Sequence, residues 1–180
     1  MEKGKIIYLN GVTSTGKTSI ARIIQDTANE FYYLIGSDIL MNMVGEKDRL
    51  NNYRKYEFEM FIDMYHIAKL LSDMGKNVII DCLLFETIDL SNHYKKLINI
   101  LGNNPLFTVN VLCPLEICRE RNIKRGDRDE FQSEEQDKMI DKTVVLDFTV
   151  YTDKYSSEEC AIMILNKILE TFPKNNYEKT

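Results

Sequence analysis

The chain has 180 residues, of which 44% are hydrophobic and 28% are charged, so it is long enough to form one globular domain with its own core. Its formal net charge of −5 argues against a nucleic-acid-binding protein, whose surface would be basic. The four cysteines contain no CxxC pair, and two histidines are too few for a typical zinc site. No apolar run approaches the ~20 residues that span a bilayer and no signal peptide opens the chain, so we expect a cytoplasmic protein that does not bind membranes.

Short β-branched runs alternate along the chain with longer amphipathic stretches, a pattern that predicts parallel βαβ units in one α/β domain. The expected strands cover residues 5–10, 31–35, 77–82, 106–112 and 146–151. The expected helices cover residues 20–27, 39–44, 53–74, 91–101, 115–125, 133–140 and 161–169. Ser133 and Gln136 match a capping box at the start of the helix 133–140. We expect residues 1–172 to form a single domain and the polar residues 173–180 to fray.

The strongest motif is GVTSTGKT at residues 11–18, which matches the phosphate-binding pattern G-x-x-x-x-G-K-[ST] at every constrained position. A predicted strand precedes the motif and an amphipathic helix follows it, as in phosphate-binding loops. The alternative is a glycine-containing turn with an exposed lysine, which would require neither the strand nor the helix. Backbone N–H groups and the helix N-terminus would bind the phosphates of ATP, Lys17 would reach the β- and γ-phosphates, and Thr18 would ligate Mg²⁺. The nucleotide-binding residues predicted here are Gly11, Ser14, Thr15, Gly16, Lys17, Thr18 and Ser19.

Two aspartates are expected at the carboxyl edge of the sheet, where open α/β folds bind their ligands. Asp81 lies at the C-terminal end of an apolar strand and is suited to hold Mg²⁺ through water or to orient Lys17. Asp38 follows the strand 31–35, where its carboxylate could take the proton of an acceptor hydroxyl that attacks the γ-phosphate. Each has a structural alternative, because a strand-end aspartate also starts turns, and Ser37 or Asp38 is equally suited to cap a helix beginning near residue 39.

The segment RERNIKRGDR at residues 119–128 is locally basic in an acidic chain. Arg121 and Arg125 are one helical turn apart, and Gly126 ends the helix so that Arg128 lies just beyond it. Arginines that close over a transferring phosphate stabilise the charge on its oxygens, so we expect Arg125 and Arg128 to be catalytic and Arg121 to bind the nucleotide. The alternative is a solvated helix with i,i+4 ion pairs.

Five short segments, spread in order over nearly the whole chain, carry a family resemblance: IIYLNG (6–11), GSD (36–38), VIID (78–81), RGDR (125–128) and EECA (158–161). The set resembles the chloramphenicol phosphotransferase-like P-loop kinases. The resemblance implies a three-layer α/β/α fold with a central parallel sheet of about five strands in adenylate-kinase-like order. It also implies transfer of phosphate from ATP to the 3′-hydroxyl of chloramphenicol or a similar compound. In that family the catalytic base matches Asp38, and a mobile lid, here about residues 119–133, carries Arg125 and Arg128.

Two features depart from that family. Cys82 follows Asp81 where the family has a second acid, and residues 39–80 lack the glycine-rich acidic stretch that helps to wall the antibiotic site. We therefore expect a small-molecule hydroxyl acceptor, with kinases of nucleosides, nucleotides or nucleotide sugars as alternatives. A nucleotide-binding switch is the alternative from a different class, although the chain has no Asn-Lys-x-Asp guanine-reading motif. The helix 53–74 carries two apolar stripes that contain methionine, aliphatic and aromatic residues. We expect most of these side chains in the core and a minority of them lining an apolar acceptor pocket.

Overall fold

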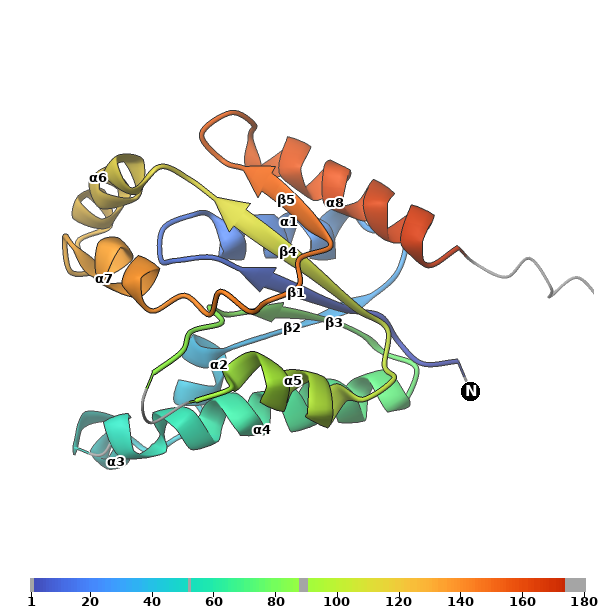
Figure 1. Ribbon diagram of the computed structural model, residues 1–180, viewed down its shortest axis with the longest axis horizontal. Helices are drawn as coiled ribbons and strands as arrows, with labels where there is room; N and C mark the ends of the chain where they lie inside the picture. Colours follow the sequence, from blue (N-terminus) through green and yellow to red (C-terminus); the bar gives the residue numbers. More distant parts are fainter. Residues whose placement is uncertain (1, 52, 88–90, 174–180) are drawn as a thin grey trace, which may run out of the picture.

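The computed structural model describes residues 2–51, 53–87 and 91–173 (Figure 1). Its strands are β1 (Ile6–Asn10), β2 (Tyr32–Gly36), β3 (Asn77–Asp81), β4 (Leu106–Leu112) and β5 (Phe148–Tyr151). Its helices are α1 (Lys17–Thr27), α2 (Ser37–Met41), α3 (Glu46–Asn51), α4 (Tyr53–Asp73), α5 (His93–Leu101), α6 (Leu115–Arg125), α7 (Gln132–Lys138) and α8 (Ser157–Thr171).

All neighbouring strands of the sheet run parallel, in the order β2-β3-β1-β4-β5. Helices α1 and α8 cover one face of the sheet, and α4 and α5 cover the other (Figure 1). Parallel neighbours cannot be joined by a tight hairpin, which explains why the connections between strands carry helices. The structure thus confirms the three-layer α/β/α fold and the adenylate-kinase-like strand order.

Two apolar cores lie on the two faces of the sheet. Successive side chains of a strand point to opposite faces, so Ile6 and Tyr8 pack toward α4 and α5, whereas Ile7 and Leu9 pack toward α1 and α8. All four are fully buried, because β1 has a strand on each side and helices above and below. Burying one such side chain contributes roughly 1.5–3 kcal/mol, so the central strands give a rigid base to the loops at their ends.

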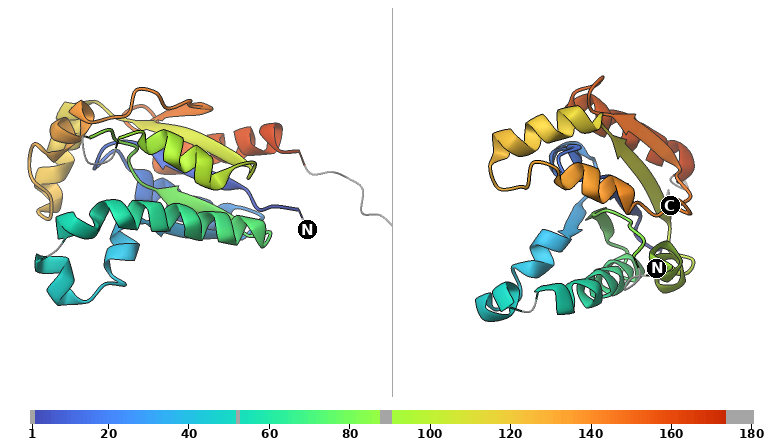
Figure 2. Two further views of the ribbon diagram at one scale, coloured as in Figure 1. Left: turned by 60° about the horizontal axis from the view of Figure 1, so that its bottom comes forward. Right: turned by 60° about the vertical axis from the view of Figure 1, so that its left-hand side comes forward.

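The carboxyl ends of the strands meet at one edge of the sheet, and α6 and α7 lie beyond that edge (Figure 1). Figure 2 (right) views this end, with α6 and α7 on one side and α2, α3 and α4 on the other. The parallel register sets Leu9 and Gly36 alongside Asp81, so the segments after β1, β2 and β3 begin close together.

The structure corrects the expected start of α7. The helix begins at Gln132, the residue before it is Phe131, and no side chain caps it, so the capping box predicted for Ser133 and Gln136 is wrong. Both side chains contact the phosphate loop instead. The bonding partners of a polar side chain in this helix are therefore distant in the sequence, which a local motif cannot reveal.

Other differences are small. Helix α3 was not predicted, because its sequence EKDRLN is too polar and short for an apolar period to show. Helix α8 begins with a capping box between Ser156 and Glu159 that the sequence analysis did not single out. The tail predicted to fray lies, beyond residue 173, outside the described residues. Within the described residues, none of the helices combines the length and apolar character that crossing a membrane requires.

Candidate active site

The phosphate-loop motif connects β1 to α1 at the carboxyl edge of the sheet. Gly16, directly before α1, has φ 97°, in the left-handed region that favours glycine. A Cβ atom at Gly11 would lie 2.5 Å from the carbonyl oxygen of Val111 on β4, so glycine alone fits where the loop leaves β1. The loop therefore leads directly into the N-terminus of α1, where backbone N–H groups and the helix dipole favour a bound phosphate.

Lys17, the first residue of α1, directs its side chain back to the loop. Its Nζ donates a 2.9 Å hydrogen bond to the carbonyl oxygen of Val12. Burial lowers the pKa of the Lys17 ammonium, and the nearby Asp81 carboxylate opposes that shift. The side chain is thus held beside the loop amides, within the region where phosphates would bind.

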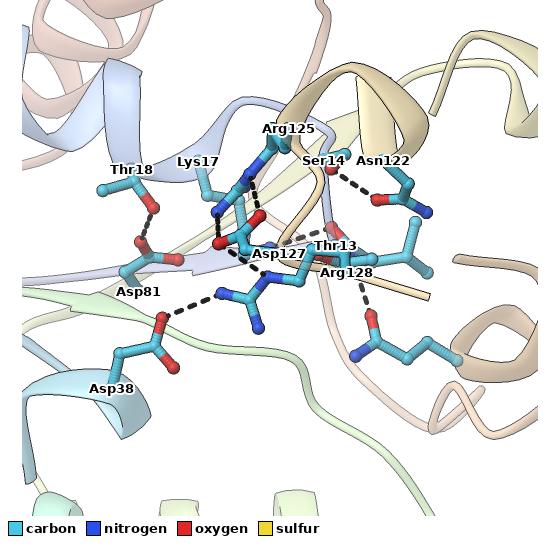
Figure 3. Close-up of polar contacts among 12 residues, drawn as sticks. Thr13, Ser14, Lys17, Thr18, Asp38, Asp81, Asn122, Arg125, Asp127 and Arg128 are labelled. Atoms are coloured by element: carbon cyan, nitrogen blue, oxygen red, sulfur yellow. Dashed lines mark hydrogen bonds and ion pairs between the residues drawn. The ribbon is translucent and has the colours of Figure 1, made fainter. Parts of the chain in front are cut away.

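Thr18 and Asp81 meet at the end of β3 (Figure 3). The Thr18 hydroxyl donates a 2.5 Å hydrogen bond to Oδ2 of Asp81, 63 residues away in the sequence. Among the described residues, no group of three or more His, Cys, Asp or Glu side chains is gathered around a possible metal position. The hydroxyl and carboxylate are nevertheless hard oxygen ligands of the kind that Mg²⁺ combines with substrate phosphates and water, so these two residues fit that ion.

Asp38, the second residue of α2, points its carboxylate at Arg128 rather than at its own helix (Figure 3). The residue before α2 is Gly36, and no side chain caps the helix, so the capping interpretation of Asp38 is wrong. Oδ2 of Asp38 instead accepts a 3.2 Å hydrogen bond from the guanidinium of Arg128. The Asp38 side chain is 78% exposed, which leaves it accessible to a second substrate.

The two arginines predicted to be catalytic have different partners. Arg125 donates to both carboxylate oxygens of Asp127, at 3.1 and 3.2 Å, and this contact lowers the pKa of Asp127. Arg128 lies between Asp38 and Asp127, with 3.8 Å between its Nε and Oδ2 of Asp127. That Nε is buried and has no hydrogen-bond partner within the described residues. The Arg128 guanidinium therefore faces two carboxylates at the edge of the cavity that it lines.

Arg121 on α6 connects the phosphate loop to the segment that follows β5. Its guanidinium donates to the carbonyl oxygen of Ser14 at 3.1 Å, and to the hydroxyl and carbonyl oxygens of Thr152 at 3.1 and 3.0 Å. The Thr152 hydroxyl in turn donates to the carbonyl oxygen of Thr15 at 2.7 Å. Thr152 is a site residue that the sequence analysis missed, because nothing local marks a threonine whose partners are so distant.

A second set of hydrogen bonds ties α6 and α7 to the loop. Oδ1 of the fully buried Asn122 accepts a 2.6 Å bond from the Ser14 hydroxyl, and its Nδ2 donates to the Ser133 hydroxyl at 3.0 Å. The Ser133 hydroxyl donates to the Thr13 carbonyl oxygen at 3.2 Å, and Oε1 of Gln136 accepts from the Thr13 N–H at 2.6 Å. The segment expected to be a lid is thus bonded directly to the phosphate loop.

A cavity of about 1290 Å³ joins these groups. Every predicted site residue except Thr15 lines it; Thr15 is buried and donates its hydroxyl to the Val12 carbonyl oxygen. The apolar side chains on its wall are Leu34, Ile39, Phe58, Phe61, Cys82, Leu83, Phe85 and Met139. Phe61 and Phe85 contact edge to face, with 5.1 Å between ring centroids. As expected, a minority of the α4 aromatic residues line a cavity.

The parallel sheet order and the phosphate loop before α1 define the class of protein, a nucleotide-binding P-loop kinase. The family model of the chloramphenicol phosphotransferase-like proteins matches residues 4–169. The chain therefore belongs to the chloramphenicol phosphotransferase-like family.

Other relatives include an adenylyl-sulfate (APS) kinase and a bifunctional enzyme. The adenylyl-sulfate kinase of Clostridium acetobutylicum is 24% identical, across 91% of this chain and 82% of that protein. The bifunctional enzyme CysN/CysC of Rhodopirellula baltica is 26% identical over 132 residues, and the match spans 68% of this chain but 18% of that enzyme. The structure of the Mycobacterium tuberculosis APS kinase CysC in complex with AMPPNP and APS shares the fold, with a TM-score of 0.68 at 20% identity, covering 93% of this chain and 99% of that one.

Proposed function

We propose that this kinase moves the γ-phosphoryl group of ATP onto a hydroxyl of a small molecule that binds beside Asp38. The observation that carries the proposal is the shared cavity, which is lined by the phosphate loop, by the Asp38 carboxylate and by a largely apolar wall. Cavities that are apolar except for a few convergent polar groups typically bind small organic molecules.

Each site residue has a distinct role in the proposed phosphoryl transfer. Lys17 and the loop N–H groups hold the β- and γ-phosphates. The acceptor hydroxyl gives its proton to Asp38 as its oxygen bonds to the γ-phosphorus, and the bond between that phosphorus and the β–γ bridging oxygen breaks. Arg128, whose guanidinium lines the cavity beside Asp38, stabilises the charge on the transferring group. Mg²⁺, held by Thr18 and Asp81, would neutralise charge on the phosphates.

The acceptor that suits this cavity best has an apolar or aromatic body, as chloramphenicol-like compounds have. Phe58, Phe61 and Phe85 form a contiguous aromatic group on the wall. Burial raises the pKa of the neighbouring Cys82 thiol to about 12, so this side chain is neutral where the family has a second acid. An uncharged aromatic ring can therefore bind here without leaving a buried charge unpaired.

A nucleotide-type acceptor is the second candidate, because one relative is named as an adenylyl-sulfate kinase. The same phenylalanines would stack on a purine ring as readily as on a benzene ring. The two candidates differ in charge, since a nucleotide would also bring its own anionic groups.

An acceptor screen tests the proposal. The protein is incubated with ATP and Mg²⁺ and with chloramphenicol-like alcohols, nucleosides, adenylyl sulfate or sugars, and products are read by a mass increase of one phosphate. We expect one phosphate on an aromatic alcohol, with ADP formed in equal amount, and loss of product in Lys17→Ala. Stoichiometric ATP binding with no transfer to any acceptor would instead indicate a nucleotide-binding switch.

A further inference from the structure

The orientation of the Gln136 side-chain amide is determined by the phosphate loop. Its Oε1 accepts a 2.6 Å hydrogen bond from the backbone N–H of Thr13. Because a backbone N–H can only donate, the oxygen end of the amide must face the loop, and the Nε2 end keeps two donor hydrogens. Gln136 lines the cavity, and within the described residues no partner bonds to its Nε2.

One peptide group connects Gln136 to Lys17. The Thr13 N–H belongs to the same peptide group as the Val12 carbonyl, whose oxygen accepts the 2.9 Å bond from Nζ of Lys17. The ammonium and the amide therefore lie at the two ends of a single peptide group. Since the lysine of this motif reaches the β- and γ-phosphates, Gln136 lies beside the same part of a bound triphosphate.

The helix that carries Gln136 is held at both ends. Ser133, one turn earlier, bonds to the Thr13 carbonyl oxygen. At the other end, the carbonyl oxygen of Met139 accepts a 2.7 Å bond from the Glu86 N–H, and Phe85 pairs with Ile140. Because α7 is held at both ends, the Nε2 amide of Gln136 needs little reorganisation to bind an anionic oxygen.

We propose that Gln136 is a substrate-binding residue whose Nε2 amide donates a hydrogen bond to an oxygen of the γ-phosphoryl group. The proposal rests on the proposed function, because it takes ATP as the donor. Lys17 and Arg128 are cationic donors, and Gln136 adds a neutral one. A third cation would also attract the Asp38 carboxylate, whereas a neutral amide donates to the phosphoryl group without adding a charge.

Equilibrium binding of ADP and of a non-hydrolysable ATP analogue tests this role, because only the analogue carries a γ-phosphoryl group. In Gln136→Glu a carboxylate oxygen still accepts the Thr13 N–H, but the donor is gone and a negative charge faces the phosphate. We expect this variant to bind the analogue on the order of tenfold to a hundredfold more weakly than the parent does, with ADP affinity changed less than about threefold. Gln136→Met should weaken analogue binding selectively but less, since it adds no charge.

Two comparisons separate this role from simpler ones. Gln132→Glu adds the same negative charge to the same cavity, one turn earlier on α7. If it weakens analogue binding as much as Gln136→Glu does, the loss comes from the added charge rather than from the missing Nε2 donor, which contradicts the proposal. If Gln136 only ties α7 to the loop, Gln136→Glu will resemble the parent and Gln136→Met will weaken the binding of ADP and of the analogue equally, which overturns the proposal.

A parent protein that binds neither nucleotide would contradict the proposed function itself. Melting temperatures confirm that each variant is folded.

Discussion

Arg128 and Asp38 lie 90 residues apart in the sequence, yet a guanidinium nitrogen of one is 3.2 Å from a carboxylate oxygen of the other (Figure 3). The contact joins α2 to the segment after α6. Because the Asp38 side chain is largely exposed, the pair contributes at most about 1 kcal/mol to stability. It brings the proposed base within one hydrogen bond of the proposed charge-stabilising group, so an acceptor hydroxyl that reaches Asp38 also lies beside Arg128.

Arg128→Ala should lower turnover much more than it weakens ATP binding, because its charge matters most when the γ-phosphoryl group is in transit. We expect a loss on the order of a hundredfold in kcat, by analogy with removal of other charge-stabilising donors. Arg128→Lys keeps the charge without the planar fork and should recover part of the rate. Steady-state kinetics measure both, and an unchanged kcat in Arg128→Ala would make this segment a solvated helix end.

Asn122→Ala should destabilise the protein and weaken nucleotide binding together. The substitution leaves the hydroxyls of Ser14 and Ser133 without their buried partner, which costs roughly 1–3 kcal/mol. Denaturant unfolding and nucleotide titration measure the two effects. Asn166→Ala, at an exposed position of α8, is the matched control and should change neither. Normal stability of Asn122→Ala would show that this network does not hold the loop.

His93 predicts a pH dependence of stability. Burial lowers the pKa of His93 to about 4, from an ordinary value of about 6.5. Between these values the unfolded chain binds a proton that the folded protein does not, so stability is lost as the pH falls from about 6.5 to about 4, by roughly 3 kcal/mol in total.

Unfolding free energies measured across that range check the assignment. His93→Gln should make the free energy of unfolding depend less steeply on pH, whatever the absolute stability of the variant. His66→Gln, at an exposed position of α4, should keep the parental dependence on pH. Equal slopes in the parent and in His93→Gln would mean that another group, such as the nearby Asp141, causes the acid sensitivity.

Much of the fold follows from local sequence. The bounds of β4 and α6 agree with those predicted, because Pro114 opens the helix and Gly126 ends it. The phosphate loop is recognisable because its glycines satisfy backbone requirements that other residues cannot meet.

What local sequence does not contain is the pairing of side chains across the cavity. Ser133 and Gln136 have the spacing of a capping box, but their partners are Thr13 and Asn122. Arg125 was predicted to close over the phosphate, and in the structure it is paired with Asp127. Such contacts depend on which loops meet at the carboxyl edge of the sheet, and this is decided by the strand order rather than by any single motif.

The central claim is that Asp38 takes the proton of the acceptor, and turnover of Asp38→Asn tests it most directly. The substitution keeps the size of the side chain but removes its ability to accept a proton. We expect a folded protein with a melting temperature near that of the parent, intact ATP binding, and turnover on the order of a hundredfold or more slower. Asp38→Ala should show a similar loss of rate, because neither variant has a base. Turnover near the parental value in Asp38→Asn would contradict the assignment of Asp38 as the base and the placement of the acceptor beside it.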